Sequence, residues 1–305
     1  MTRRILCIGE VMAELRRDGI GFVVGFAGDT FNTAVYCNRL LGDAGDVDYL
    51  TRVGDDPLSG GFLKSANDEG VGISDVSRDP VKNLGIYSVQ TDPSGERSFA
   101  YWRDQSAARN LFQNECDFTA LNGADIIYFS GITLAILPPN IRTEFLERLR
   151  HLRQSGAALL AFDSNYRPAL WEGPSTARQV TTTAWSMTDI ALPSIDDEML
   201  LFGDADEASV LERLRDCGCR SGALKRAESG PISINPDALV TMEFAPAEHV
   251  VDTTAAGDSF NGGFLAAFAK GLPVQACMAE GHNLARAVVG RRGAIVETKM
   301  ETQHG

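Results

Sequence analysis

The chain has 305 residues, and its 28 lysines and arginines against 41 aspartates and glutamates give a formal net charge of −13 at pH 7. With 44% hydrophobic and 23% charged residues, it has the composition of a globular protein, which excludes a disordered chain, a collagen-like chain and a disulfide-stapled mini-protein. An acidic chain repels polyanions at long range, so nucleic acid is not expected as a partner.

The cysteines and the N-terminus indicate where the protein works. Six cysteines stand at positions 7, 37, 116, 217, 219 and 277, and only the pair at 217 and 219 is close in sequence. No second pair or histidine cluster completes a zinc site, so we expect reduced thiols. The apolar run 5–9 is too short for a signal peptide, and no stretch approaches 18 apolar residues. These features predict a cytoplasmic protein without a membrane partner.

Short apolar runs alternate along the chain with longer helical patterns. The predicted strands are 5–8, 48–53, 125–130, 157–162, 189–192 and 222–225. The predicted helices are 30–41, 58–69, 140–154, 176–184, 198–202, 208–217 and the apolar stretch 264–269. This alternation indicates βαβ units around a mostly parallel sheet with helices on both faces. Such sheets bind ligands beyond the carboxyl ends of their strands.

Two segments interrupt the alternation. Residues 84–103 hold two strand-like runs around Asp92-Pro93-Ser94-Gly95, a turn sequence, and residues 14–27 hold apolar residues between glycines. We expect a small β-sheet lid made of 14–27 and 84–103 over a discontinuous core made of 1–13, 28–83 and 104–305. Exposed edges of such a lid favour pairing with a second subunit, so a homo-oligomer through the lid is expected.

The stretch 250–263, VVDTTAAGDSFNGG, carries the strongest chemical signal. Small residues let the N–H groups of Ala255, Ala256 and Gly257 converge, and the helix that begins there adds partial positive charge, so an anion is stabilised without a lysine. Asp258 projects into this anion hole, where it can accept a hydroxyl proton during phosphoryl transfer. The helix dipole predicts a low pKa for Asp258. The alternative is a helix start whose glycines serve close packing only.

The whole string 250–263 resembles the second signature of the ribokinase or PfkB family of carbohydrate kinases. The segment GFAGDTFNTA at 25–34 resembles the family's N-terminal sugar-binding element, and VGDD at 53–56 resembles its G-x-D. The resemblance spans residues 5–297. It implies a ribokinase-like three-layer α/β/α sandwich with a mostly parallel central sheet and a small β-sheet lid, ATP with Mg²⁺, and a sugar site that includes Gly28, Asp29 and Asn32.

Four further segments, 101–103, 130–136, 162–171 and 194–198, resemble the branch of the family that phosphorylates the 6-hydroxyl of 2-keto-3-deoxygluconate, a sugar acid. A guanidinium matches a carboxylate bidentately, and Arg103 and Arg167 are the candidates for this contact. Tyr101 shares a strand face with Arg103, and Tyr87 lies across the hairpin and can add a hydroxyl. Surface ion pairs and lid packing are the alternative roles for these four residues.

The resemblance places the nucleotide on the other side of the site. It assigns Asn165, Arg167 and Ser194 to the phosphates and the stretch from Lys225 to Gly230 to the adenosine pocket. Asn283, on the penultimate helix, faces either the adenine or solvent. The family's usual K-x-G is Lys225-Arg226-Ala227 here. A Cβ at 227 strains a turn that needs positive φ by about 1 kcal/mol, unless the loop is shifted.

Two kinds of cation are considered for the site. Mg²⁺ is carried mainly by phosphate oxygens and water, with Asp197 and Glu198 close by. Asp252 and Thr254 either contribute oxygens to a monovalent cation, as the resemblance implies for K⁺, or form a turn in which Asp252 caps its own backbone.

Three other functions stay open. The substrate could be a neutral sugar such as fructose or ribose, or the epimer 2-keto-3-deoxygalactonate. A non-catalytic sugar-acid-binding regulator is favoured by the altered loop 226–230 and disfavoured by the presence of Asp258. The chain has no G-x-x-x-x-G-K-[ST] phosphate loop, and its four histidines lack zincin spacing.

Overall fold

The computed structural model describes residues 3–91, 97–235 and 242–297. The strands are β1 Arg3–Ile8, β2 Met12–Asp18, β3 Gly21–Ala27, β4 Gly45–Leu50, β5 Arg52–Val53, β6 Ser77–Arg78, β7 Gly85–Thr91, β8 Arg97–Trp102, β9 Ile126–Ser130, β10 Leu159–Asp163, β11 Ile190–Ala191, β12 Ala223–Leu224 and β13 Ile232–Ser233. The helices are α1 Asp29–Leu41, α2 Pro57–Asp68, α3 Glu115–Thr119, α4 Gly131–Ile136, α5 Pro139–Gln154, α6 Pro174–Trp185, α7 Ile195–Phe202, α8 Glu207–Asp216, α9 Ala256–Ala269 and α10 Val274–Val289. Within these described ranges, no helix is both long and apolar enough to cross a membrane.

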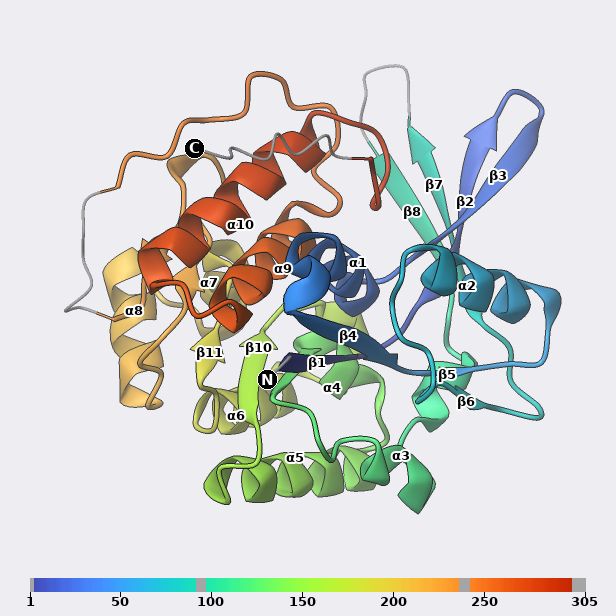
Figure 1. Ribbon diagram of the computed structural model, residues 1–305, viewed down its shortest axis with the longest axis horizontal. Helices are drawn as coiled ribbons and strands as arrows, with labels where there is room; N and C mark the ends of the chain where they lie inside the picture. The colour runs from blue at the N-terminus through green and yellow to red at the C-terminus, as the bar shows by residue number, and fades with distance from the viewer. Residues whose placement is uncertain (1–2, 92–96, 236–241, 298–305) are drawn as a thin grey trace.

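A five-stranded parallel sheet in the order β11-β10-β9-β1-β4 forms the centre of the molecule (Figure 1). Neighbouring residues of each strand point to opposite faces. Phe129 and Phe162 therefore pack into one apolar core with α5, α6 and α8, whereas Tyr128 and Ala161 pack into a second core with α1, α9 and α10. The predicted three-layer α/β/α sandwich is confirmed.

The strand predicted over 48–53 is in fact two strands in different sheets. Leu50 pairs with Ile8, the last residue of β1, so the chain has no partner in the central sheet beyond this point. Residues 52–53 form β5, which pairs with β6 instead. The strand predicted over 222–225 is likewise shorter: it is β12, which forms an antiparallel pair with β13. Isolated bridges join this region to the chain at the edge of the central sheet, such as Ser194 with Lys225.

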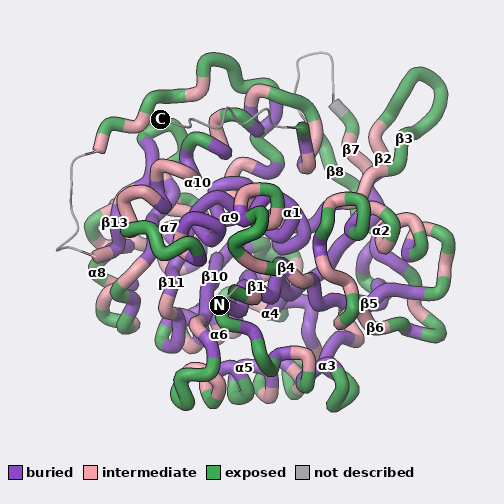
Figure 2. Tube along the Cα trace, in the orientation of Figure 1, coloured by how far each residue is buried: buried purple, intermediate pink, exposed green. Residues whose placement is uncertain are grey.

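A second sheet in the order β3-β2-β7-β8 projects from the central layers, and its free end is exposed (Figures 1 and 2). Its register places Glu14, Tyr87 and Tyr101 in one row across three strands, and Val24, Leu15 and Ser88 in a row on the opposite face. The small β-sheet is thus present as predicted. The turn predicted at 92–95 lies outside the described residues, and the division of the chain into core and lid stays a prediction.

Glycines let three helices approach one another closely. A Cβ on Gly262 would come within 2.9 Å of Thr33 O on α1, and a Cβ on Gly263 would come within 2.9 Å of Gly281 Cα on α10. These contacts fix α9 between α1 and α10, so its first turn, with Asp258, lies beside the start of α1. The glycine pair therefore serves packing, and that packing positions the site.

Candidate active site

The predicted site residues gather at the carboxyl edge of the central sheet. Asp163 ends β10, Ser194 follows β11, and Lys225 follows β12. Helix α9 begins at the same edge, with Ala255 as its N-cap and Asp258 as its third residue. This is the edge at which an open α/β sheet binds its ligands.

Asp258 contacts the predicted sugar-binding residues of α1. Asn32 Nδ2 donates to Asp258 Oδ2 at 2.8 Å, and the Gly28 N–H donates to Asn32 Oδ1 at 3.3 Å. Asp29 accepts a hydrogen bond from Asn165 Nδ2 at 2.8 Å. A Cβ on Gly28 would lie 2.1 Å from Glu10 O, so only glycine fits this turn. The structure therefore brings Gly28, Asp29 and Asn32 together with Asp258.

The prediction of a low pKa for Asp258 is wrong. Burial, followed by the negative charges of Asp29 and Asp163, raises the pKa of Asp258 to about 8, against the opposing hydrogen bond from Asn32 and the charge of Lys225. Removal from water and two like charges thus outweigh a helix dipole whose effect is confined to the first turn. A carboxyl that titrates near neutral pH is suited to exchange protons with a substrate hydroxyl.

Tyr87, Tyr101 and Arg103 line the face of the small sheet that carries Glu14. The rings of Tyr87 and Tyr101 are 5.9 Å apart, and the Arg103 guanidinium carbon lies 5.9 Å from the centre of the Tyr101 ring. The Tyr87 hydroxyl donates to the Glu14 carboxylate. Burial, and next the charge of Glu14, raise the pKa of Tyr87. The predicted common face is confirmed.

The partner of Arg103 is a residue that sequence reasoning missed. Arg103 forms a buried ion pair with Glu10, of which only 1% is exposed. Gly85 makes room for this pair, because a Cβ there would lie 3.1 Å from Glu10 Oε1 and 3.4 Å from Arg103 Cβ. The signal in the sequence was an acidic residue, Glu10, two positions after the end of the first strand.

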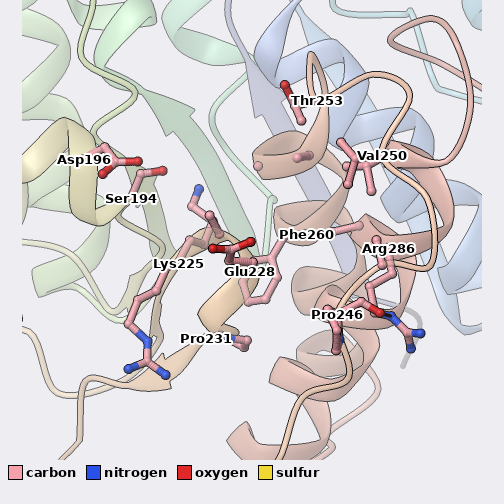
Figure 3. A pocket seen from close by; sticks show the side chains of 17 residues that line it. Ser194, Asp196, Lys225, Glu228, Pro231, Pro246, Val250, Thr253, Phe260 and Arg286 are labelled. Carbon is pink, nitrogen blue, oxygen red and sulfur yellow. Dashed lines mark hydrogen bonds between the residues drawn. The ribbon is translucent and has the colours of Figure 1, made fainter.

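A cavity of about 330 Å³ opens beside the start of α9, where Ala256, Gly257 and Phe260 line it (Figure 3). At one end its lining holds Ser194 and the predicted anion-hole residues Ala256 and Gly257, and at the other it is largely apolar, a combination that suits a nucleotide. Lys225, which was predicted for the adenosine pocket, and Thr253 belong to the first end, and the apolar end includes Pro231, Pro246, Phe260, Ala285 and Val289.

Four predicted nucleotide residues are not among those that line this cavity. Asn283 is exposed on α10, which is the last helix in the described ranges, and the face of α10 toward the cavity carries Ala285, Arg286 and Val289 instead. Gly230 is buried behind the cavity wall, where a Cβ would meet Phe244 at 2.6 Å. Asn165 contacts Asp29. Arg167 is half exposed and bonds to Asp197 at 3.0 Å.

The loop after Lys225 adopts the strained turn expected from the sequence. Ala227 has φ +47°, in the left-handed region that favours glycine. The loop is therefore not shifted to avoid the strain, and Ala227 lines the cavity where the sequence resemblance led us to expect a glycine.

Lys225 turns its amino group inward. Its Nζ donates to Asp163 Oδ2 at 2.6 Å and to Asn261 Oδ1 at 3.0 Å. Asn261 Nδ2 in turn donates to Asp163 at 2.7 Å and to the Tyr128 hydroxyl at 3.0 Å. Sequence reasoning also missed Asp163 and Asn261 as site residues, although they lie inside the family-like segments 162–171 and 250–263.

The candidate cation ligands have protein partners. Asp252 Oδ1 accepts from Thr254 N at 3.0 Å and from Thr254 Oγ1 at 2.7 Å, which is the turn-capping alternative. Glu198 is buried and paired with Arg213 at 2.8 Å, so it points away from the cavity. Across the described part of the chain, no three His, Cys, Asp or Glu residues form a metal-binding group. A Mg²⁺ ion here would take its ligands mainly from phosphate and water. The carboxylates in the described cavity wall are Asp196 and Glu228, whereas the predicted Asp197 bonds to Arg167 at 3.0 Å.

Comparison with known sequences agrees with this geometry. Residues 2–301 match the model of the pfkB family of carbohydrate kinases. The 2-dehydro-3-deoxygluconokinase of Dickeya dadantii is 40% identical over 302 residues, which cover 97% of each chain. The enzyme of the same name from Escherichia coli K12 is 38% identical over 305 residues, covering 97% of this chain and 98% of that one.

Solved structures show the same fold. The fructokinase of Vibrio cholerae O395, determined with fructose, ADP and a calcium ion, has a TM-score of 0.82 at 22% identity and covers 96% of this chain and 94% of its own. A double mutant of that fructokinase was determined with fructose, ADP and a potassium ion and has a TM-score of 0.81.

Proposed function

The chain belongs to the pfkB family of carbohydrate kinases, and from this premise we propose that it transfers the γ-phosphoryl group of ATP to the 6-hydroxyl of 2-dehydro-3-deoxygluconate, also called 2-keto-3-deoxygluconate. The observation that carries the proposal is the place of Asp258. Its carboxylate accepts a hydrogen bond from Asn32 of the sugar-binding motif, and the two residues before it, Ala256 and Gly257, line the cavity that suits a nucleotide.

The reaction needs one proton acceptor and one anion site. The sugar 6-oxygen attacks the γ-phosphorus of ATP, its proton passes to the Asp258 carboxylate, and the bond from the γ-phosphorus to the bridging oxygen breaks with its electron pair leaving on ADP. Asn32 fixes the orientation of the carboxylate through its 2.8 Å hydrogen bond. The N–H group of Gly257 at the start of α9 stabilises the transferring group, as in an anion hole, whereas the N–H of Ala256 donates to Thr253 O at 3.1 Å.

Arg103 and Arg167 are proposed to recognise the substrate carboxylate, with Tyr87 and Tyr101 beside it. Arg103 is held by Glu10 on the inner face of the small sheet, which supports a preorganised contact. Arg167 must exchange its bond to Asp197 to take part, and its half-exposed side chain permits this movement.

Mg²⁺, when bound with ATP, would neutralise phosphate charge. A K⁺ requirement through Asp252 and Thr254 remains a weaker proposal, because both are engaged with each other in the turn. The six cysteines are free thiols, which favours a reducing compartment such as the cytoplasm.

A substrate panel tests the function. We expect kcat/KM for 2-dehydro-3-deoxygluconate to exceed the values for fructose and ribose by about 100-fold or more, because a neutral sugar offers no carboxylate to the guanidinium groups of Arg103 and Arg167. Measurement with the galactonate epimer reports on the remaining hydroxyl contacts. Asp258→Asn is the matched control and should lose activity with every sugar, by about 1,000-fold.

Equal kcat/KM for the sugar acid and the neutral sugars would contradict the proposed substrate. Sugar-acid binding without any ATP turnover would instead support the non-catalytic regulator.

A further inference from the structure

Lys225 is one of the most constrained residues of the site. Only 9% of it is exposed, and its ammonium is held by Asp163 and Asn261. Its backbone is held as well, because Lys225 N donates to Pro193 O at 2.8 Å and Lys225 O accepts from Ile195 N at 3.0 Å. The position of the charge is therefore fixed before any nucleotide arrives.

This fixed charge lies at the anion hole and not at the adenosine end of the cavity. A Cβ built on Gly257 would lie 3.6 Å from Lys225 Nζ, and both residues line the cavity wall together with Ser194 and Thr253. Figure 3 shows the amino group of Lys225 turned away from Pro231 and Pro246 at the apolar end. Glycine at 257 leaves open the space between the ammonium and the first turn of α9.

One donor of the ammonium is still available. An ammonium group has three N–H donors, and the bonds to Asp163 and Asn261 use two of them. No other described residue takes the third. Because Asp258, Asp163 and Asp29 surround the same region with negative charge, a phosphoryl group entering it requires a compensating cation.

We propose that Lys225 donates its third N–H to the γ-phosphoryl group of ATP and holds that group over the first turn of α9. This inference rests on the proposed phosphoryl transfer and deepens it. The resemblance assigned Lys225 to the adenosine pocket; the structure assigns its charge to the transferring group. A charge-assisted hydrogen bond of this kind is stronger than a neutral one and restricts the phosphorus to one position beside Asp258.

Nucleotide binding to Lys225→Met tests the contact without any sugar. We expect isothermal calorimetry to show that a non-hydrolysable ATP analogue with Mg²⁺ binds about 10- to 100-fold more weakly than to the unmodified protein. ADP with Mg²⁺ and adenosine, which lack the γ-phosphoryl group, should change by less than about threefold. Lys225→Arg, which keeps the charge, should recover part of the lost affinity.

Two further variants separate this contact from a general disturbance. Arg226→Met is the matched control, because Arg226 lines the same cavity but bonds to Gly230 O at 2.9 Å and Glu207 at 2.8 Å; it should change ADP and the analogue equally. If Lys225→Met fails to fold because Asp163 is left unpaired, Asp163→Asn/Lys225→Met removes both charges and keeps the measurement possible.

Equal weakening of ADP and the analogue in Lys225→Met, or no weakening of either, would overturn the inference. A selective loss of the analogue supports it whichever sugar the enzyme prefers. The substrate panel and this binding experiment can therefore fail independently.

Discussion

Asp258 receives its unusual proton affinity from its neighbours, and this makes activity pH-dependent. Its pKa is raised to about 8 by burial and by the charges of Asp29 and Asp163. A proton acceptor works only when ionised, so we expect kcat/KM to rise with pH up to about 8 and to level off above it. Asp29→Asn removes one of the negative charges, so the pH at which kcat/KM levels off should fall by about one unit.

Initial rates between about pH 5.5 and 9.5 measure this shift. Asp68→Asn is the control, because the Asp68 side chain is 56% exposed at the end of α2, where it pairs with Lys64. If kcat/KM of the unmodified enzyme levels off already near pH 4, or if the pH profile of Asp29→Asn is unchanged, the neighbouring carboxylates do not set the proton affinity of Asp258.

The roles of single residues were predictable where a short stretch of sequence determines them. Gly28, Asn32 and Asp258 lie in short motifs whose function follows from a turn and a helix start, and the structure brings them together. The ion pair between Glu10 and Arg103 joins positions 93 apart in sequence. Such a pair depends on how the small sheet folds back on the central sheet, which local pattern does not encode.

The turn at the start of the nucleotide loop stores strain that a single substitution can release. Ala227 has φ +47°, which costs an L-residue about 1 kcal/mol and glycine little. We expect Ala227→Gly to stabilise the protein by about 0.5 kcal/mol. Glycine removes the strain of the turn, but the entropy that it gains in the unfolded chain offsets about half of that gain. Thermal unfolding should show a rise of about 1 °C.

Ala247→Gly is the matched control for this loop. Ala247 lines the same cavity but is not among the described residues with positive φ, so glycine there should lower the midpoint. A lower midpoint for Ala227→Gly as well would show that the turn is not strained.

Elements were predictable when their own pattern decided them. The central strands and α1, α2, α5, α6 and α8 follow from apolar periodicity, and their observed bounds differ by a few residues. The break between β4 and β5 depends on where β1 ends, because a strand needs a partner to continue. That information lies elsewhere in the chain.

At the scale of the molecule, the two faces of the small sheet differ in what they carry. Glu14, Tyr87 and Tyr101 occupy the inner face. The register places Phe22 and Val24 of β3 and Trp102 of β8 on the opposite face. Of these three residues 62%, 46% and 61% are exposed, respectively. Exposed apolar side chains on the two edge strands of a sheet favour association.

We therefore expect a dimer in which a second copy of this chain covers the outer face of the small sheet. Fully burying one of these apolar side chains stabilises the dimer by about 2 kcal/mol. A charged side chain placed among them should therefore separate the subunits. Val24→Lys should convert the dimer to a monomer in sedimentation equilibrium at about 10 µM, because a lysine in a closed apolar interface loses its hydration. Val23→Lys changes the neighbouring residue, which is 44% exposed but belongs to the inner face, and should remain dimeric. A monomeric unmodified protein, or a Val24→Lys variant that stays dimeric, would exclude the outer face as the interface.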